Sequence, residues 1–467
     1  MGDARPGVPD PASFPVTGGP TGRGFAEALA HFHGQSHDKD VSQVATLFFG
    51  AEPSNGLARS VPGQVRPALP ALSALRDLDM AAAPLDGPWS PAQRLLSACV
   101  EAVRVRRLSA GDRYPVHRAY PSPRGLFGAD LFLLPRTGTA WCVRVDPQSH
   151  ALQPMNASRV PDDPEELADA RPVVAVDHRR YPPEYGRLRP SLALLEGGHL
   201  LAALGATLTR AGLTPHTHVD PAHEVGRRAR AVLPPEMEPI AALTLDGPGP
   251  AGGVVLPAAA TSRAVASAGR PGRTLRRWLD DRTSGLSTAN LVTSAHIAPD
   301  RGAGVTSALV TALHEVGSVL PAPDALRLYR HVLADDRVDG RTMRELLPDG
   351  TEGPDRPVPR SGATNFSSTL GYTLTVDFPA WARVHGPHAE PILHTLLGWI
   401  GQWGCLGAAS TDLCARPMRN FAEEEWASVL GLDPDQTPVY QLWVRSERGT
   451  YMDIPVDAGD GTPSEAS

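Results

Sequence analysis

The feature that most constrains the fold of this chain is a weak internal repeat. When the second half of the 467-residue sequence is slid back by 200 positions, five identities line up: Val176 with Val376, Asp177 with Asp377, Gly186 with Gly386, Gly198 with Gly398, and Leu213 with Leu413. The same order of elements surrounds them in each half, namely an apolar β-like run, a turn, and a long helix rich in glycine and alanine. The sequence therefore predicts a tandem duplication.

Segments rich in proline and glycine divide the chain further. Residues 1–24 lack the basic and then apolar order of a secretory signal, and we expect a disordered tail there. Residues 246–273 are small and weakly periodic, as in a linker between domains, and residues 457–467 are expected to form a second disordered tail. The predicted domains are therefore residues 25–245 and residues 274–456.

Within each half, helical patterns alternate with short β-branched runs. Ser90 followed by Pro91 predicts a helix start, because serine caps the first free backbone N–H groups and proline suits the first helical position. Further strands are expected at Leu131, Trp141 and Val439, and further helix starts at Pro164 and Phe421. The expected class is α+β, with a mixed or antiparallel sheet flanked by helices in each domain.

Composition excludes several classes of function. A formal net charge of −7 and a pI near 6.1 argue against nucleic acid as a partner. The most apolar stretch, residues 391–410, contains a histidine, a glutamine and four glycines, which suits packing inside protein better than lipid, so no membrane association is expected. The cysteines form no CxxC pair and no zinc spacing, which favours a cytoplasmic location; they are Cys99, Cys142, Cys405 and Cys414.

Several motifs resemble those of nitroreductase-like flavoproteins, especially their azoline dehydrogenase branch. RAYPSPRGLFGADLFLL, which begins at Arg118, is similar to that branch's loop-and-strand signature. EYGRLRPSLALLEGGHLLAALGATLTRAGL resembles its Tyr-Gly turn and long helix, and GWIGQWGCLGAAS resembles the matching helix of the second half. Similarity is also found in ALAHFHGQSHDKD and LARSV near the N-terminus, and in DRTSG at Asp281.

The resemblance implies two tandem nitroreductase-like domains that pack as an internal pseudo-dimer, in a monomer or a homodimer. It implies FMN as the cofactor and, as the activity, oxidation of azoline rings to azoles in a ribosomally synthesised peptide, a step of natural product biosynthesis. The partners it implies are the peptide substrate and a cyclodehydratase. Neither the substrate nor the half that holds the active site can be identified from the sequence.

Residues for binding FMN follow from the chemistry of the cofactor. A phosphate requires guanidinium and hydroxyl donors, which Arg59 with Ser60, or Arg282 with Ser284, could supply. Gly125 permits close approach of the backbone to a flat ring because it has no Cβ. Further candidates for contact with the flavin are Ser122, Arg124, His199 and Gln402. His199 and Gln402 could equally be residues packed in the core or at the domain interface.

The catalytic candidates are Tyr185 and Glu184. The dehydrogenase branch has a Lys-Tyr pair, and Glu184 with Tyr185 occupies its place in the first half, while Val384 with His385 occupies it in the second. Glu184 could act as a base if it were partly desolvated, or the pair could be a turn with a solvated carboxylate. The loss of the lysine therefore leaves two alternatives open: a flavin-free interaction subunit of a peptide-modifying complex, or a flavin reductase acting on another small molecule.

The run HTHVDPAHE resembles a metal cluster, because alternate histidines on a strand share a face. Pro215 and Pro221 interrupt any regular scaffold for such a cluster. No metal site is predicted there.

Overall fold

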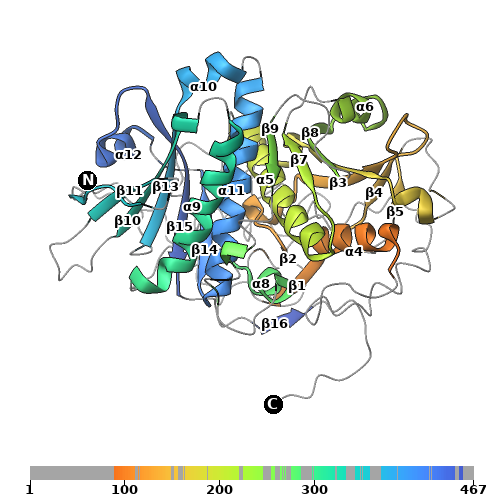
Figure 1. Cartoon of the computed structure of the whole chain (residues 1–467), viewed down its shortest axis with the longest axis horizontal. Coiled ribbons are helices and arrows are strands. Elements are labelled where there is room, and N and C mark those ends of the chain that lie inside the picture. Colours follow the sequence, from red (N-terminus) through yellow and green to blue (C-terminus); the bar gives the residue numbers. More distant parts are fainter. Residues whose placement is uncertain are drawn as a thin grey trace, which may run out of the picture.

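The computed structural model describes most of residues 89–455, and its longest internal gaps are 246–253, 285–296, 333–341 and 358–369. Arg59, Ser60 and both predicted tails lie outside the described residues. Two large antiparallel sheets, one from each half of the chain, enclose a central layer of long helices (Figure 1).

The first sheet has the strand order β5-β4-β3-β6-β8-β7-β9. Its strands are β3 (Ala129–Leu134), β4 (Val143–Val145), β5 (Leu152–Pro154), β6 (Arg171–Val176), β7 (His216–Val219), β8 (Glu238–Thr244) and β9 (Val254–Pro257). Strand β9 pairs with β7, so part of the segment 246–273, which we expected to be a linker, belongs to this sheet.

The second sheet repeats this order as β12-β11-β10-β13-β15-β14. Its strands are β10 (Leu326–Val332), β11 (Thr342–Leu346), β12 (Arg356–Pro357), β13 (Leu370–Asp377), β14 (Cys414–Met418) and β15 (Gln436–Arg445). Each strand has a counterpart in the same place of the first sheet, and β6, β7 and β8 lie about 200 positions before β13, β14 and β15. The predicted duplication and the α+β class are confirmed.

The helices follow the same repeat. They are α4 (Pro91–Val103), α5 (Leu188–Arg210), α6 (Glu224–Val232), α8 (Leu275–Asp281), α9 (Ala303–Val319), α10 (Phe378–His385), α11 (Ala389–Ser410) and α12 (Glu423–Leu430). Ser90 caps α4 as expected, in a capping box with Gln93. The helix expected from Pro164 is only a 3-10 turn, Pro164–Leu167, and β6 begins a few residues later.

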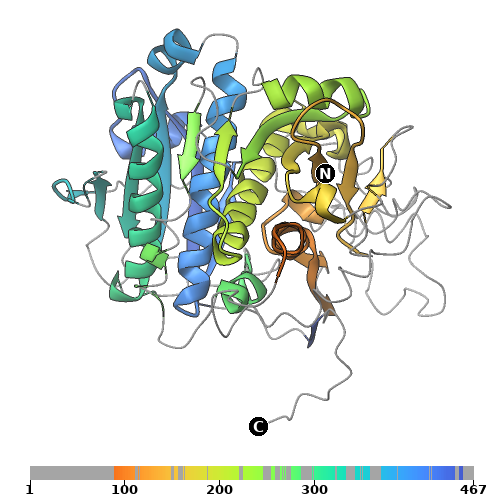
Figure 2. The same cartoon turned by 45° about the vertical axis from the view of Figure 1, so that its right-hand side comes forward.

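The long helices α5, α11 and α9 lie side by side between the two sheets (Figures 1 and 2). Their buried residues and the inner faces of both sheets form one continuous hydrophobic core. Helix α6 covers the outer face of the first sheet, and α12 covers that of the second. The domains therefore pack as an internal pseudo-dimer, with α5 and α11 at its centre.

Two glycines allow α5 and α11 to approach closely. A Cβ on Gly198 would lie 2.0 Å from the carbonyl oxygen of Thr395, and a Cβ on Gly398 would lie 2.0 Å from the carbonyl oxygen of Leu195. Both contacting pairs are related by the spacing of 200 residues. The repeat seen in the sequence is therefore also the pseudo-twofold relation at the helix crossing.

A third, small sheet joins the halves a second time. Strand β1 (Val105–Ala110) pairs with β2 (Val116–Arg118) and with β16 (Met452–Pro455), so the last described strand of the chain crosses to the first half. Among the described residues, Leu188–Arg210 is the one helix long and apolar enough to span a membrane, and 94% of its apolar window is buried inside the protein.

Candidate functional site at the seam

A buried hydrogen-bond chain crosses the seam between the halves. The Gln402 side-chain amide donates to the carbonyl oxygen of Ala119 (2.8 Å), so its oxygen is oriented to accept from Nδ1 of His199 (3.1 Å). Nε2 of His199 then accepts from the Tyr440 hydroxyl (2.6 Å). Burial lowers the pKa of His199 to about 3, although Gln402 opposes the shift, and the ring is neutral. The side chains of the two candidates His199 and Gln402 are therefore hydrogen-bonded to each other.

The loop that follows β2 holds Ser122, Arg124 and Gly125, and it has an unusual backbone. Arg124 (φ 54°) and Phe127 (φ 49°) occupy the left-handed region beside Gly125 (φ 65°). Non-glycine residues rarely adopt this conformation, and surrounding contacts are needed to hold them in it. The loop lies close to the seam, because Ala119 at its start accepts the Gln402 bond.

Glu196, on α5, fixes this loop from one side. Its carboxylate accepts hydrogen bonds from the hydroxyls of Ser122 (2.5 Å) and Tyr181 (2.6 Å) and from the backbone N–H of Ala129 (3.0 Å). Burial raises the pKa of Glu196, while these bonds oppose the shift. Because the Ser122 hydroxyl also accepts from the N–H of Phe127, it is fully committed within the protein.

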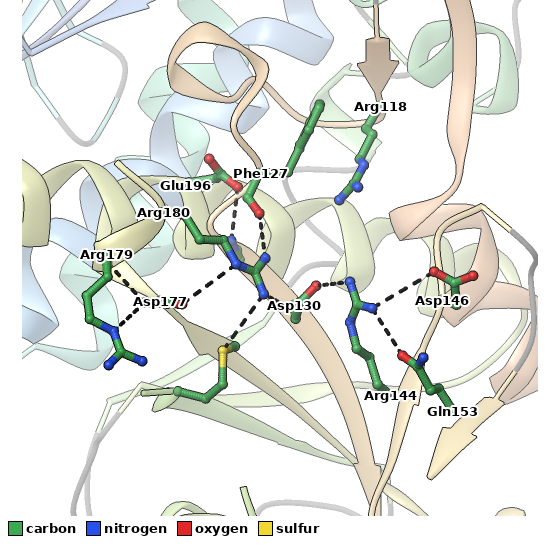
Figure 3. Close-up of polar contacts among 12 residues, drawn as sticks. Arg118, Phe127, Asp130, Arg144, Asp146, Gln153, Asp177, Arg179, Arg180 and Glu196 are labelled. Atoms are coloured by element: carbon green, nitrogen blue, oxygen red, sulfur yellow. Dashed lines mark hydrogen bonds and ion pairs between the residues drawn. The ribbon is translucent and has the colours of Figure 1, made fainter. Parts of the chain in front are cut away.

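Charged groups fix the loop from the other side (Figure 3). Arg180 donates to the carbonyl oxygen of Phe127 (2.7 Å) and pairs with Asp130, which also pairs with Arg144. Burial alone would raise the pKa of Asp130, but the charges of the two arginines outweigh this effect and hold the pKa of the carboxyl well below its usual range. The Arg118 guanidinium lies 3.9 Å from the centre of the Phe127 ring. The loop is therefore a rigid element.

Arg282 lies at the same seam, directly after α8. Its side chain is buried, and its guanidinium donates to the backbone carbonyl of Arg118 (3.4 and 3.2 Å). Its Nη1 has no hydrogen-bond partner, and no carboxylate pairs with it among the described residues. Burial, with a smaller contribution from the charge of Arg107, lowers the pKa of Arg282 to about 10. The charge of Arg282 also contributes to the lowered pKa of His199.

Two further arginines lie on strands β14 and β15, and β14 is the strand to which this segment is fastened. The backbone N–H of Ala415 on β14 donates to the carbonyl of Thr283 (3.2 Å), which fastens the Arg282–Ser284 segment to the sheet edge. Arg416 is the next residue on β14, and Arg445 ends the neighbouring strand β15. Burial and then the charge of Arg445 lower the pKa of Arg416. The sequence analysis did not select these two residues, since nothing local distinguishes them from the other arginines.

The catalytic candidates lie in a short 3-10 turn, Pro183–Tyr185, before α5. Tyr185 is partly buried, and the Arg124 guanidinium lies 5.2 Å from the centre of its ring. The Glu184 side chain lies outside the described part of the structure. In the run HTHVDPAHE, where no metal site was predicted, Asp220 and His223 also lie outside the described part, and the buried His218 hydrogen-bonds to Thr244 (3.1 Å).

Comparison with solved structures identifies the class of fold. A nitroreductase structure from Anabaena variabilis matches with a TM-score of 0.57 and 14% identity, over 83% of this chain and 94% of that one. The fold is therefore nitroreductase-like, as the motifs led us to expect. No protein-family model matches the sequence, and no curated protein matches it significantly.

Two other matches are partial and carry no functional argument. A nitroreductase structure from Ralstonia eutropha gives a TM-score of 0.29 at 16% identity, over 39% of this chain and 85% of that one. The E. coli microcin synthetase McbBCD complex with truncated pro-MccB17 bound gives 0.25 at 14% identity, over 33% of this chain and 65% of that chain.

Proposed function

We propose that this protein is an FMN-dependent oxidoreductase whose cofactor binds at the seam between the two halves. The observation that carries the proposal is the burial of Arg282 without an acidic partner among the described residues. A buried cation is costly unless a counter-charge and hydrogen bonds compensate it. A phosphate monoester would supply both, and the hydroxyl of Ser284 lies two residues further along the chain.

The residues at the phosphate end fit FMN, whereas the ring end offers fewer free side chains. Arg282 and Ser284 would hold the phosphate, and the loop around Gly125 would provide backbone groups for the ring. Ser122, His199 and Gln402 are already engaged within the protein, so they would shape and rigidify the site. When bound, FMN accepts a hydride and passes two electrons on to an acceptor such as dioxygen.

For the substrate we propose an azoline ring in a ribosomally synthesised peptide, on the basis of the sequence motifs. Conversion to an azole removes one hydride and one proton from the ring, so a positioned base is required beside the cofactor. Tyr185 and Glu184 are the candidates for this role, and the Arg124 guanidinium lies 5.2 Å from the centre of the Tyr185 ring. A cyclodehydratase would supply the azoline, and both partners would meet the protein in the cytoplasm.

The visible spectrum of the purified full chain tests the cofactor. We expect flavin absorption that heat denaturation releases as FMN, and we expect Arg282→Gln to lose it. Arg277→Gln is the matched control, because that arginine lies on the adjoining helix with its side chain 63% exposed. Failure of the wild-type chain to bind added FMN would refute the proposal.

The substrate role is tested by Tyr185→Phe. The variant should keep its FMN and lose azoline oxidation by about a hundredfold or more, the usual contribution of a general acid or base. Mass spectrometry of a peptide substrate would detect the loss of two hydrogens per ring. Unchanged turnover would remove Tyr185 from the catalytic assignment.

A second function is favoured by the engagement of the side chains of Ser122, His199 and Gln402 in hydrogen bonds within the protein. In this alternative, the chain is a flavin-free subunit that keeps the fold in order to position a peptide or a partner enzyme. A colourless protein that still binds the peptide would support this function over the first.

A further inference from the structure

The duplication gives every position at the seam a counterpart in the other half. Because the two sheets share one strand order and the central helices cross through residues 200 apart, a second site related by the pseudo-twofold axis is geometrically defined. Its parts can be compared directly with those of the site at Arg282.

The first difference is in chain length. In the first half, residues 104–128 connect α4 to β3, and they contain β1, β2 and the rigid loop with Ser122 and Gly125. In the second half, α9 ends at Val319 and β10 begins at Leu326, so the corresponding connection is residues 320–325. The second half is too short there to form either the hairpin or the loop.

The second difference is in charge. Arg416 on β14 has His216 on β7, and by the pairing of the strands the counterpart of Arg445, at the end of β15, is Asp246, which lies outside the described residues. Gln402, which ties α11 to the loop, has Ala202 on α5. The counterparts of Arg416, Arg445 and Gln402 therefore carry neither a guanidinium group nor an amide.

From these differences we infer that the chain binds one FMN, at a single composite site. The second half contributes the phosphate contacts through Arg282 and Ser284, and the first half contributes the backbone platform, residues 119–128. The counterpart position is not a cofactor site. This inference rests on the proposed function and goes beyond it, because a nitroreductase-like pseudo-dimer with two equivalent sites would bind two cofactors.

Titration of the full-length protein with FMN, followed by calorimetry and by the flavin-to-chain ratio after gel filtration, tests the inference. We expect one FMN per chain. Arg282→Gln should weaken FMN binding tenfold or more while leaving riboflavin, which lacks the phosphate, unaffected. Ser284→Ala provides a milder second variant in case the loss of a buried arginine impairs folding.

The outcomes distinguish failure of the single-site inference from failure of the proposed function. Arg59→Gln, in the N-terminal segment with the alternative Arg-Ser pair, should bind FMN as the wild type does. A ratio of two, or loss of binding in Arg59→Gln, would overturn the single-site inference and leave the proposed cofactor standing. A wild-type chain that binds no FMN would instead overturn the proposed function itself.

Discussion

The crossing of α5 and α11 offers a sharp test of the seam, through the substitution Gly198→Ala. The added Cβ would lie 2.0 Å from the Thr395 carbonyl oxygen, whereas an ordinary carbon–oxygen contact is about 3.3 Å. Because the contact atom belongs to the backbone of another helix, no side chain can rotate to relieve it. The helices must separate by about 1 Å over a buried interface.

The magnitude follows from two opposing effects. Overpacking of this kind costs about 3 kcal/mol or more, while replacing glycine by alanine inside a helix returns about 1 kcal/mol. We therefore expect Gly198→Ala to lower the free energy of unfolding by about 2 kcal/mol or more. Gly398→Ala should behave alike, because its Cβ would lie 2.0 Å from the Leu195 carbonyl oxygen.

Urea unfolding followed by circular dichroism would measure these effects. The matched control is Gly317→Ala on α9, where the nearest atom, on Pro323, lies at an ordinary 3.6 Å, so stability should be unchanged or slightly higher. The double variant Gly198→Ala/Gly398→Ala should cost less than the sum of the single variants, since one separation relieves both contacts. If Gly198→Ala were as stable as Gly317→Ala, the described crossing would be wrong.

Three further predictions concern buried polar groups. His331 packs against both Trp426 and Trp443, and burial lowers its pKa to about 3. The unfolded chain binds this proton near pH 6.5, so the contribution of neutral, buried His331 to the free energy of unfolding is complete above pH 6.5 and is lost as the pH falls towards 3. His331→Asn should therefore reduce the difference in the free energy of unfolding between pH 7 and pH 5 by about 2 kcal/mol. The exposed His314 is the control, and His314→Asn should leave that difference unchanged. Glu196→Gln should lower the free energy of unfolding by about 2 kcal/mol, because a single amide oxygen cannot accept all the hydrogen bonds that the two carboxylate oxygens accept from Ser122, Tyr181 and Ala129. Urea unfolding would measure the change, and an unchanged midpoint of the unfolding transition would contradict the assigned contacts. All four cysteines are buried, and burial raises the pKa of Cys142 and Cys405 to about 12. An alkylating reagent should therefore label the cysteines only after the protein has unfolded, as measured by mass spectrometry. Rapid labelling of the native chain would show that the core is more open than described.

Much of the candidate site could be selected from the sequence, but whether the polar groups of its residues are already hydrogen-bonded within the protein could not. The motifs selected Ser122, His199, Arg282 and Gln402, and all four lie at or beside the seam. That the Ser122 hydroxyl is committed to Glu196 could not be foreseen, since 74 positions separate the two residues. Hydrogen-bond saturation depends on such distant neighbours.

The sequence by itself determined the duplication, the helix start at Ser90 and the strands β3, β4, β6, β13 and β15, because periodicity, capping and spacing are local properties that survive without a fold. Only the tertiary structure decided that Arg282 is a buried cation, that its segment is fastened to β14, and that the connection before β10 is too short for a second loop. Burial and charge compensation are set by segments that meet only once the chain has folded. For that reason, two halves with one topology are able to offer a single site.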